Sequence, residues 1–360
     1  MKKVLILTDG KAGHENQSKA FARALGCEFD LVEVHFKSKL AKTLSYLLDR
    51  VGVRTTALLS IAVDCNRLQS NPVAVIGTGS GTFYAAKAMA KKLGVKCGVV
   101  LYPRGYDIAS FDCVLAPAFD RPKTAANVIE IPANLVANDE AFYEKGVAAF
   151  WEKRGGQQAY DNKGEAVAAF WERRGGQQAY DNKGEAVAAF WERRGGQQAY
   201  DNKGESVAVI VGGPNKCSTM TPEWMKAQLD AIFNSKPQTL KNSKTEFWVT
   251  TSRRTPPAVE AVVDSYPWDY KLLYSKDHFN PIPAFVKLAK KLYVTAESTG
   301  MLSESCTFGS AEVVALDNLN PGPHKFRRFV EDLRRGGYVD GNRKVDLSAQ
   351  FARAKALMGI

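Results

Sequence analysis

A histidine and an acidic residue follow the first apolar run of the chain. That run, residues 4–7, has the composition of a buried strand, and it ends in a polar loop that holds Asp9, Gly10, Gly13 and His14. An imidazole is suited to proton transfer near neutral pH, and a carboxylate can orient it or act as the base itself. We therefore expect His14 and Asp9 to be catalytic candidates. Because an ordinary strand-to-helix turn has the same glycine spacing, the glycines alone do not decide this.

The same arrangement recurs in the second half of the chain. A β-branched run ends in Gly212 and Gly213, and Pro222 stands where the next helix is predicted to begin. Glycines let the backbone approach a ligand, and the helix N-terminus behind them favours anionic groups. Two halves that each begin with a strand and a glycine turn predict two Rossmann-like domains facing each other across a cleft.

Hydrophobic periodicity predicts alternating strands and helices in both halves, which is typical of doubly wound α/β domains. Strands are predicted at 4–7, 30–36, 73–77, 98–101, 113–116 and 128–131, and then at 207–212, 246–251, 270–275, 292–296 and 312–316. Helices are predicted at 17–25, 39–49, 55–68 and 81–93, and then at 222–233, 256–264, 281–290, 299–307, 324–335 and from about Ser348. The predicted domains are 1–140 and 205–338, with a linker at 141–204 and a C-terminal tail or helix at 339–360.

Three near-identical copies of one segment occupy most of this linker. They cover 147–163, 167–183 and 187–203, and each contains a Gly-Gly pair that is expected to end a helix. We interpret 164–203 as an in-frame duplication inserted into an interdomain linker. A binding arm built from the repeated Phe-Trp pairs is the alternative.

Composition limits the classes of ligand and compartment. The 360 residues include 49 Lys and Arg against 38 Asp and Glu, a net charge of +11, which suits nucleotides, phosphorylated substrates or an anionic membrane surface. The six cysteines and four histidines have no metal-ligand spacing, so we expect no metal site, no cofactor and a cytoplasmic protein with reduced thiols. No apolar run approaches the length of a membrane span, so membrane contact would be peripheral, at the inner face of the cell membrane.

Polar side chains in the second half gather at the predicted ends of strands. Arg253 and Arg254 offer planar forks for phosphate oxygens, although they could equally be solvated loop residues. Thr299 and Gly300 stand at a predicted helix N-terminus suited to a diphosphate. Glu304 could accept hydrogen bonds from ribose hydroxyls, or it could stabilise the helix dipole.

Four segments together resemble the mitochondrial fission ELM-type family, which occurs in plants and bacteria. They are 9–17, 212–216, 250–257 and 294–304, and the resemblance spans nearly the whole chain outside the repeats. Plant members are linked to recruiting a dynamin-like protein to mitochondria, a role that is not carried over to this chain. The resemblance does imply one alternative function, a non-catalytic nucleotide-binding scaffold that recruits a protein partner.

The layout more distantly resembles GT-B glycosyltransferases, especially the bacterial cell-wall N-acetylglucosaminyltransferase that acts on a lipid-linked acceptor. Gly13-His14 and the turn 77–81 match its glycine loops, and Ser303-Glu304 matches the Ser-Glu that holds the ribose of UDP. Ala296-Glu297-Ser298 stands where that enzyme has Arg-Ser-Gly, and 317–324 matches its donor-sugar motif poorly. The resemblance therefore implies a nucleoside-diphosphate donor and leaves the sugar open.

The leading hypothesis is a GT-B-like glycosyltransferase that moves a sugar from a nucleoside-diphosphate donor to a lipid-linked or cell-envelope acceptor. A nucleotide-sugar epimerase remains a further alternative, and no nucleic-acid partner is expected. The expected donor-binding residues are Gly212, Gly213, Lys216, Ser252, Arg253, Arg254, Asn280, Ser298, Thr299, Gly300, Ser303 and Glu304. The expected acceptor-binding residues are Gly10, Gly13, Glu15, Asn16, Gly79, Ser80 and Gly81.

Segment 37–63 combines basic residues with an apolar face. Lys37, Lys39, Lys42, Arg50 and Arg54 accompany a single acid, Asp49. A basic amphipathic helix beside the acceptor site would suit peripheral contact with an anionic membrane. The alternative is a core-facing helix, because Leu40, Leu44, Leu47 and Leu48 have the spacing of an ordinary buried face.

Overall fold

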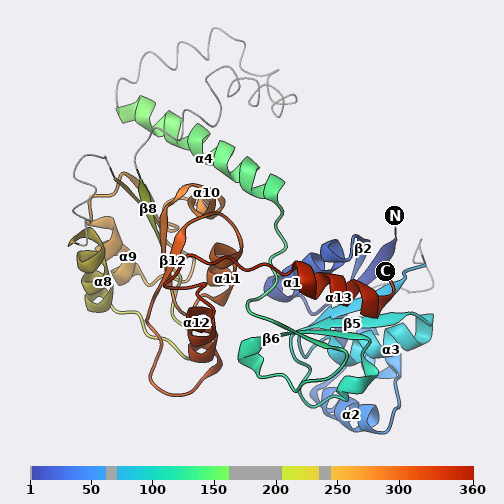
Figure 1. Ribbon diagram of the computed structural model, residues 1–360. Helices are drawn as coiled ribbons and strands as arrows, with labels where there is room; N and C mark the ends of the chain where they lie inside the picture. Colours follow the sequence, from blue (N-terminus) through green and yellow to red (C-terminus); the bar gives the residue numbers. More distant parts are fainter. Residues whose placement is uncertain (1, 62–70, 162–204, 235–244) are drawn as a thin grey trace.

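The structure is a computed structural model that describes residues 2–61, 71–161, 205–234 and 245–360, and it contains two α/β domains (Figure 1). The second and third repeat copies, and the second half (62–68) of the helix predicted at 55–68, lie outside these residues. Figure 1 shows the first domain in blue to teal, with the red C-terminal helix beside it, and the second domain in yellow to red, with a long green helix above it.

The first domain is built on a sheet with the strand order β3-β2-β1-β4-β5-β6-β7. All described pairs are parallel except β2 with β3, which is antiparallel. The strands are β1 (Lys3–Thr8), β2 (Glu28–Phe36), β3 (Leu59–Ile61), β4 (Ala74–Thr78), β5 (Lys96–Val100), β6 (Cys113–Pro117) and β7 (Val128–Ile131). The helices are α1 (Ala12–Ala24), α2 (Lys39–Arg50) and α3 (Phe83–Leu93), with short 3-10 turns η1 (Thr56–Leu58), η3 (Ile108–Ser110) and η4 (Ala118–Asp120).

The first apolar run of the chain, residues 4–7, lies in β1, the central strand of this sheet. Val4 and Ile6 point into a core shared with α1, while Leu5 and Leu7 point into a core shared with α3. Successive side chains alternate between the faces of a strand, so a continuous apolar run is what a strand covered on both faces requires. This is why β1 is buried on both sides.

The second domain repeats the plan with the strand order β10-β9-β8-β11-β12, all parallel. Its strands are β8 (Ser206–Ile210), β9 (Glu246–Thr250), β10 (Tyr270–Leu272), β11 (Lys291–Thr295) and β12 (Glu312–Leu316). Its helices are α8 (Pro222–Asn234), α9 (Pro257–Asp264), α10 (Ile282–Leu288), α11 (Thr299–Thr307) and α12 (Lys325–Arg335). Both domains share the Rossmann order, in which the chain reverses direction across the sheet beside the first strand.

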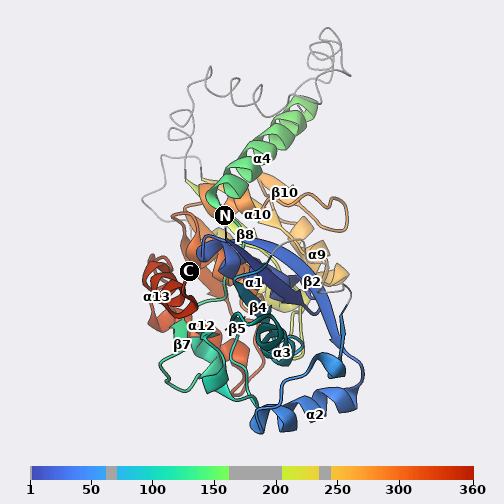
Figure 2. The same cartoon turned by 90° about the vertical axis from the view of Figure 1, so that its right-hand side faces the viewer.

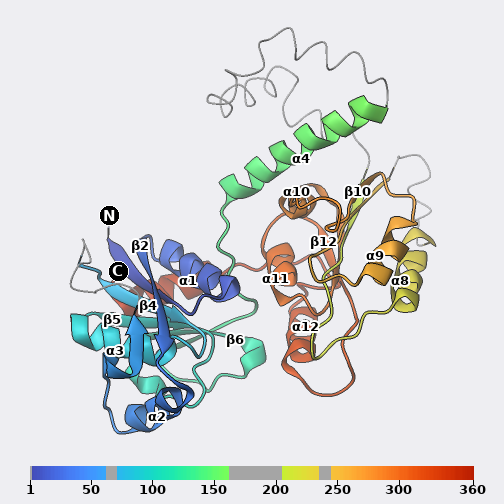
Figure 3. The same cartoon turned by 180° about the vertical axis from the view of Figure 1, so that it is seen from behind.

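Two helices tie the domains together. Helix α4 (Glu140–Asp161) leaves the first domain and packs along α10 of the second, whereas α13 (Ser348–Met358) ends the chain against β5, β6 and β7 of the first (Figures 1 and 3). The buried Phe150 ring of α4 lies against Trp248, Tyr270 and Phe285. The second domain is therefore completed by α4, which precedes it in the sequence, and the first domain by α13, which follows the second.

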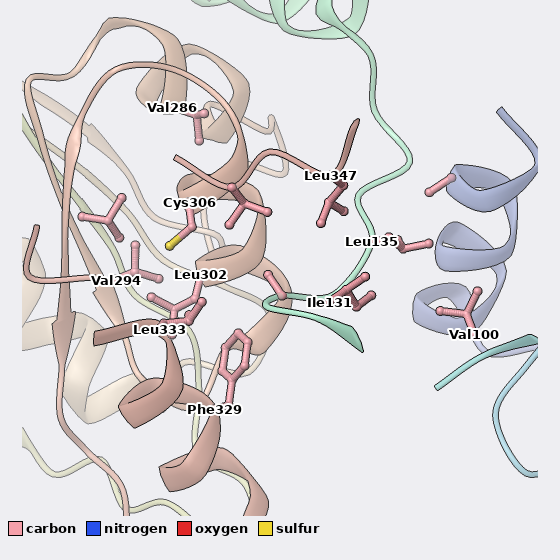
Figure 4. Close-up of a cluster of buried hydrophobic side chains, with 14 of the residues drawn as sticks. Val100, Ile131, Leu135, Val286, Val294, Leu302, Cys306, Phe329, Leu333 and Leu347 are labelled. Carbon is pink, nitrogen blue, oxygen red and sulfur yellow. The ribbon is translucent and has the colours of Figure 1, made fainter. Parts of the chain in front are cut away.

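One apolar cluster runs from the first domain into the second. Figure 4 shows Ile131 and Leu135, from the end of β7 and the segment after it, between Val100 on one side and Leu302 and Phe329 on the other. Because this cluster is continuous, the domains share part of their hydrophobic core.

Two Rossmann-like domains joined in this way confirm the predicted GT-B-type fold class. Most predicted elements are present with small shifts at their ends, and three local predictions are wrong. Helix α1 begins at Ala12, so His14 lies in its first turn and not in the preceding loop. Part of the helix predicted at 55–68 is strand β3, which pairs with the edge of the sheet at β2. The Gly155-Gly156 pair does not end α4, which continues to Asp161.

Candidate functional site

The loops after β1 and β4 meet at the point where the strand order of the first sheet reverses. Asp9 leaves β1 just before α1, and His14 stands in the first turn of that helix. The His14 Nδ1 atom lies 3.0 Å from Asp9 Oδ1 and 3.2 Å from Oδ2, and Lys11 Nζ donates to Oδ2 at 2.6 Å. The structure thus brings together the two catalytic candidates at a switch point, where open α/β sheets bind their ligands.

The Asp9 carboxylate is held in its ionised form. Burial acts to raise its pKa, but hydrogen bonds from Lys11 and His14 and the charges of both residues outweigh burial, so the pKa of Asp9 lies below its usual value. An ionised Asp9 assigns the proton of the imidazole to Nδ1 by its hydrogen bond. The Nε2 atom of His14 is then the one able to accept a proton from a ligand.

The glycine turn after β4 closes around this pair. A Cβ atom on Gly79, which has φ +82°, would overlap the His14 imidazole, and one on Gly81 would lie 2.8 Å from the Asp9 side chain. Between them, Ser80 Oγ accepts a hydrogen bond from Lys42 Nζ at 3.1 Å. Glycine is required at these positions because a side chain would displace His14 and Asp9.

The other predicted acceptor-side residues are less closely involved. Gly10 has φ +77° and begins the loop after β1, while Gly13 lies in α1 with open space where a side chain would be. Glu15 forms an ion pair with Lys19 at 2.6 Å, and Asn16 is exposed on α1.

In the second domain, the backbone amides of the glycine turn after β8 donate hydrogen bonds to side chains of the same domain. Gly212 N donates to Thr295 Oγ1 at 2.8 Å, and Gly213 N donates to Glu297 Oε1 at 2.7 Å. A Cβ atom on Gly212 would overlap the Glu297 carboxylate, and one on Gly213 would overlap the backbone of Arg254. These glycines serve loop packing, and their N–H groups are already engaged.

Glu297 joins the loops at the carboxyl ends of three strands. It is 2% exposed, and its carboxylate also accepts hydrogen bonds from Thr295 Oγ1 at 3.1 Å and Asn318 Nδ2 at 2.8 Å. Burial raises its pKa, against the effect of these donors. Sequence reasoning missed this function for Glu297, which stood out only as a departure from the GT-B pattern, and nothing in the sequence pointed to Asn318.

The remaining predicted donor-side residues divide into exposed and enclosed groups. The exposed residues on the loops are Lys216, Arg253, Arg254 and Asn280. Asn280 Oδ1 accepts from Ile282 N at 3.2 Å, and Ser252 Oγ lies 3.2 Å from Thr255 Oγ1. Ser298 is buried just before α11, and Thr299 and Gly300 form the first turn of that helix beside the Glu297 network.

Ser303 and Glu304 face the segment that connects the domains. Ser303 Oγ donates to Thr299 O at 2.7 Å and accepts from Asn134 N at 3.1 Å. Glu304 Oε1 accepts from the Tyr143 hydroxyl of α4 at 2.9 Å, and burial raises the pKa of Glu304 despite its hydrogen bonds to Tyr143 and Asn138. A ribose bound by Glu304 would have to share the carboxylate with these partners.

Neither a metal cluster nor a membrane span is found in the described part of the chain. No group of His, Cys, Asp and Glu side chains is placed there to hold a metal ion. Among the same residues, no helix has both the length and the apolar composition to cross a bilayer.

The model of the mitochondrial fission ELM1 family matches residues 12–348, from the start of α1 to the start of α13, so His14 lies within the match and β1 and Asp9 precede it. The chain belongs to this family. No match was found among curated proteins.

Several solved structures resemble the chain along most of its length. An S. aureus MnaA–UDP structure has a TM-score of 0.41 and 14% identity, covering 99% of this chain and 87% of that one. The UDP-GlcNAc 2-epimerase from Neisseria meningitidis bound to UDP-GlcNAc has a TM-score of 0.42 and 10% identity, covering 100% of this chain and 98% of that one. Phytolacca americana UGT2 with UDP-2fluoro-glucose and pterostilbene has a TM-score of 0.41 and 10% identity, covering 100% of this chain and 94% of that one. The fold assignment rests on the strand order of the two sheets.

Proposed function

We propose that this protein is a GT-B-like glycosyltransferase that uses a nucleoside-diphosphate sugar and transfers the sugar to a hydroxyl of a lipid-linked or cell-envelope acceptor. The observation that carries the proposal is the His14–Asp9 pair at the switch point of the first sheet, enclosed by Gly79 and Gly81. A scaffold that only recruits a partner would not need an imidazole oriented by an ionised carboxylate.

The chemistry assigned to this pair is general-base catalysis. His14 Nε2 would take the proton of the acceptor hydroxyl as its oxygen attacks the anomeric carbon and the nucleoside diphosphate leaves. Asp9, already ionised, would stabilise the imidazolium that forms. The pair lies where Lys11 and Lys42 add positive charge, which suits an acceptor that carries phosphate.

The donor would bind at the second switch point, between the loops after β8 and β11. The N-terminus of α11, with Thr299 and Gly300, would receive the diphosphate because the amides of Gly212 and Gly213 are engaged elsewhere. Arg253 and Arg254 are exposed on the neighbouring loop and could contact the phosphates as the donor binds. The Glu297 network would hold these loops in register.

A thermal-shift series with UDP, GDP, CMP and dTDP tests donor binding, since a ligand that binds only the folded state raises the melting temperature. Glu304→Ala should weaken binding of the responding nucleotide by about 1.5–3 kcal/mol if Glu304 contacts the ribose. Tyr143→Phe is the matched control, because it removes the same hydrogen bond within the protein and leaves the carboxylate in place. Equal nucleotide affinity in wild type and Glu304→Ala would show that Glu304 only anchors α4.

Turnover is tested with the sugar derivatives of the nucleotide that binds and an envelope lipid extract. His14→Ala should lower the rate by about 10²–10⁴-fold while nucleotide binding is kept. His35→Ala is the control, because His35 is exposed on β2 and contacts Glu33. Nucleotide binding without turnover would favour the scaffold function, and conversion of the donor sugar without any acceptor would favour an epimerase.

A further inference from the structure

Helix α2 presents an apolar stripe to solvent. Leu40 is 81% exposed, Leu44 42%, Leu47 56% and Val51, which caps the helix, 72%. Their spacing of four, three and four positions places them along one face of the helix. In the views of Figures 1 and 2, α2 lies at the edge of the first domain, away from α4.

The inward face of α2 combines small and polar residues with Tyr46 and Leu48, which pack against the core. Ala41, Ser45 and Asp49 are buried. Ser45 Oγ lies 3.0 Å from the Tyr106 hydroxyl, and the Asp49 carboxylate forms an ion pair with Lys87 at 2.7 Å. These polar contacts hold the helix on the domain without using the exposed leucines. The core-facing alternative is therefore wrong for Leu40, Leu44 and Leu47, whereas Leu48 does pack against the core.

The exposed charges of α2 and its flanking residues, 37–54, are of one sign. Lys37, Lys39 and Arg50 are exposed, and Lys42 and Arg54 are partly exposed. The one acid between residues 37 and 54, Asp49, is 1% exposed and paired with Lys87. An apolar stripe on a segment whose exposed charges are all basic matches a surface that is apolar inside and anionic at its boundary, as an anionic bilayer is.

We propose that α2 docks on an anionic lipid surface, with Leu40, Leu44, Leu47 and Val51 inserted at the interface and the basic residues facing the headgroups. A second copy of the chain is disfavoured as the occupant, because two identical stripes would bring their basic borders together. A lipid surface offers the opposite charge.

The position of α2 connects this surface to the proposed acceptor site. Lys42 of α2 donates to Ser80 in the glycine turn that encloses His14. A protein docked through α2 would therefore hold His14 beside the membrane, where a lipid-linked acceptor would be presented. This orientation rests on the proposed function, whereas lipid binding by α2 does not.

Co-sedimentation of the full chain with vesicles tests the proposal. The vesicles are phosphatidylcholine alone or phosphatidylcholine with phosphatidylglycerol, each at low and high salt. Wild type should sediment with the anionic vesicles at low salt and be released as salt rises. Leu40→Gln combined with Leu47→Gln should reduce the bound-to-free ratio by about tenfold or more, because both side chains lose their insertion.

Leu31→Gln is the matched control, since Leu31 is a 41% exposed leucine on β2 outside the stripe and its substitution should leave sedimentation unchanged. Lys37→Gln combined with Lys39→Gln provides a second variant, which should bind vesicles less and lose part of the salt dependence.

The proposal would be overturned if wild type did not sediment with the vesicles, or if the double variant Leu40→Gln with Leu47→Gln sedimented as wild type does. A wild-type dimer in light scattering that the leucine pair dissociates, without vesicle binding, would assign the stripe to self-association. Vesicle binding by a protein that binds no nucleotide would support α2 docking and contradict the proposed function.

Discussion

Asp9 and Glu297 are carboxylates at the switch points of the two sheets, and their neighbours suit them to different tasks. Asp9 is bonded to Lys11 and His14, which hold its pKa below the usual value. The donors to Glu297 are a backbone amide, a hydroxyl and a side-chain amide, and burial raises its pKa. Asp9 is thus suited to stabilise an imidazole that becomes charged, whereas Glu297 is suited to hold loops together.

A titration test belongs to Glu304. Its folded-state pKa is raised above the ordinary value of 4.5, so the stability it contributes is fully present below that value and is lost as the pH rises through the folded pKa. Glu304→Gln keeps an oxygen to accept from Tyr143 and cannot titrate. We expect the free energy of unfolding of this variant, relative to wild type, to increase from acid to neutral pH in urea titrations.

The control for this test is Glu331→Gln, since Glu331 is exposed on α12. Its free energy of unfolding should follow that of wild type across the same pH range. A Glu304→Gln profile parallel to wild type would contradict the assigned effect of burial on the pKa of Glu304.

At the scale of elements, the turn between β4 and α3 decides the geometry of the candidate catalytic pair. Gly79 adopts a left-handed conformation with the His14 ring where its side chain would be. Thr82 follows, and its hydroxyl donates to Gly79 O at 3.1 Å, which fixes the turn at the start of α3. The loops after β1 and β4 therefore form one unit, although they are far apart in the sequence.

Gly79→Ala should displace His14 and abolish turnover. The left-handed backbone conformation alone costs about 1–2 kcal/mol for a residue with a Cβ atom, and the overlap with the imidazole adds to this. Gly94→Ala is the matched control, because Gly94 caps the end of α3, the helix that follows Gly79. It also has a positive φ, +67°, but has open space around its Cβ position. In urea unfolding both variants should be destabilised, with the larger loss for Gly79→Ala. Equal losses with full turnover in both would contradict the contact between Gly79 and His14.

At the scale of the whole molecule, the domains exchange helices at their boundaries. The first repeat copy contributes Phe150 to the core between α4 and the second sheet, so this copy is part of the fold. The chain end returns to the first domain, where Met358 lies near Gly98 of β5 and Arg353 donates to Ala126 O at 2.7 Å. Each domain therefore packs against a helix that lies outside the run of strands and helices that forms it: α13 for the first domain and α4 for the second.

Deletion of residues 164–203 should leave the fold intact. It removes two repeat units and keeps the copy that contains Phe150, and changes in linker length cost little in loop-closure entropy. Thermal unfolding should therefore shift only slightly. Phe150→Ala is the contrasting variant, expected to lower the free energy of unfolding by about 3–5 kcal/mol because the ring is fully buried. A large loss of stability in the deletion would show that the later copies pack on the domains.

The sequence by itself determined the alternation of strands and helices, the glycine turns and the proximity of His14 to Asp9, because all of these depend on local periodicity and short spacing. Only the tertiary structure decided which groups the turns bring together. Gly79 meets His14, and Gly213 meets Glu297, across sequence separations that no local pattern encodes. The leucines of α2 show the same limit, since periodicity tells which residues share a face but not which face is buried. Here the face with Asp49, which pairs with Lys87, lies inward together with Leu48, and Leu40, Leu44 and Leu47 lie outside.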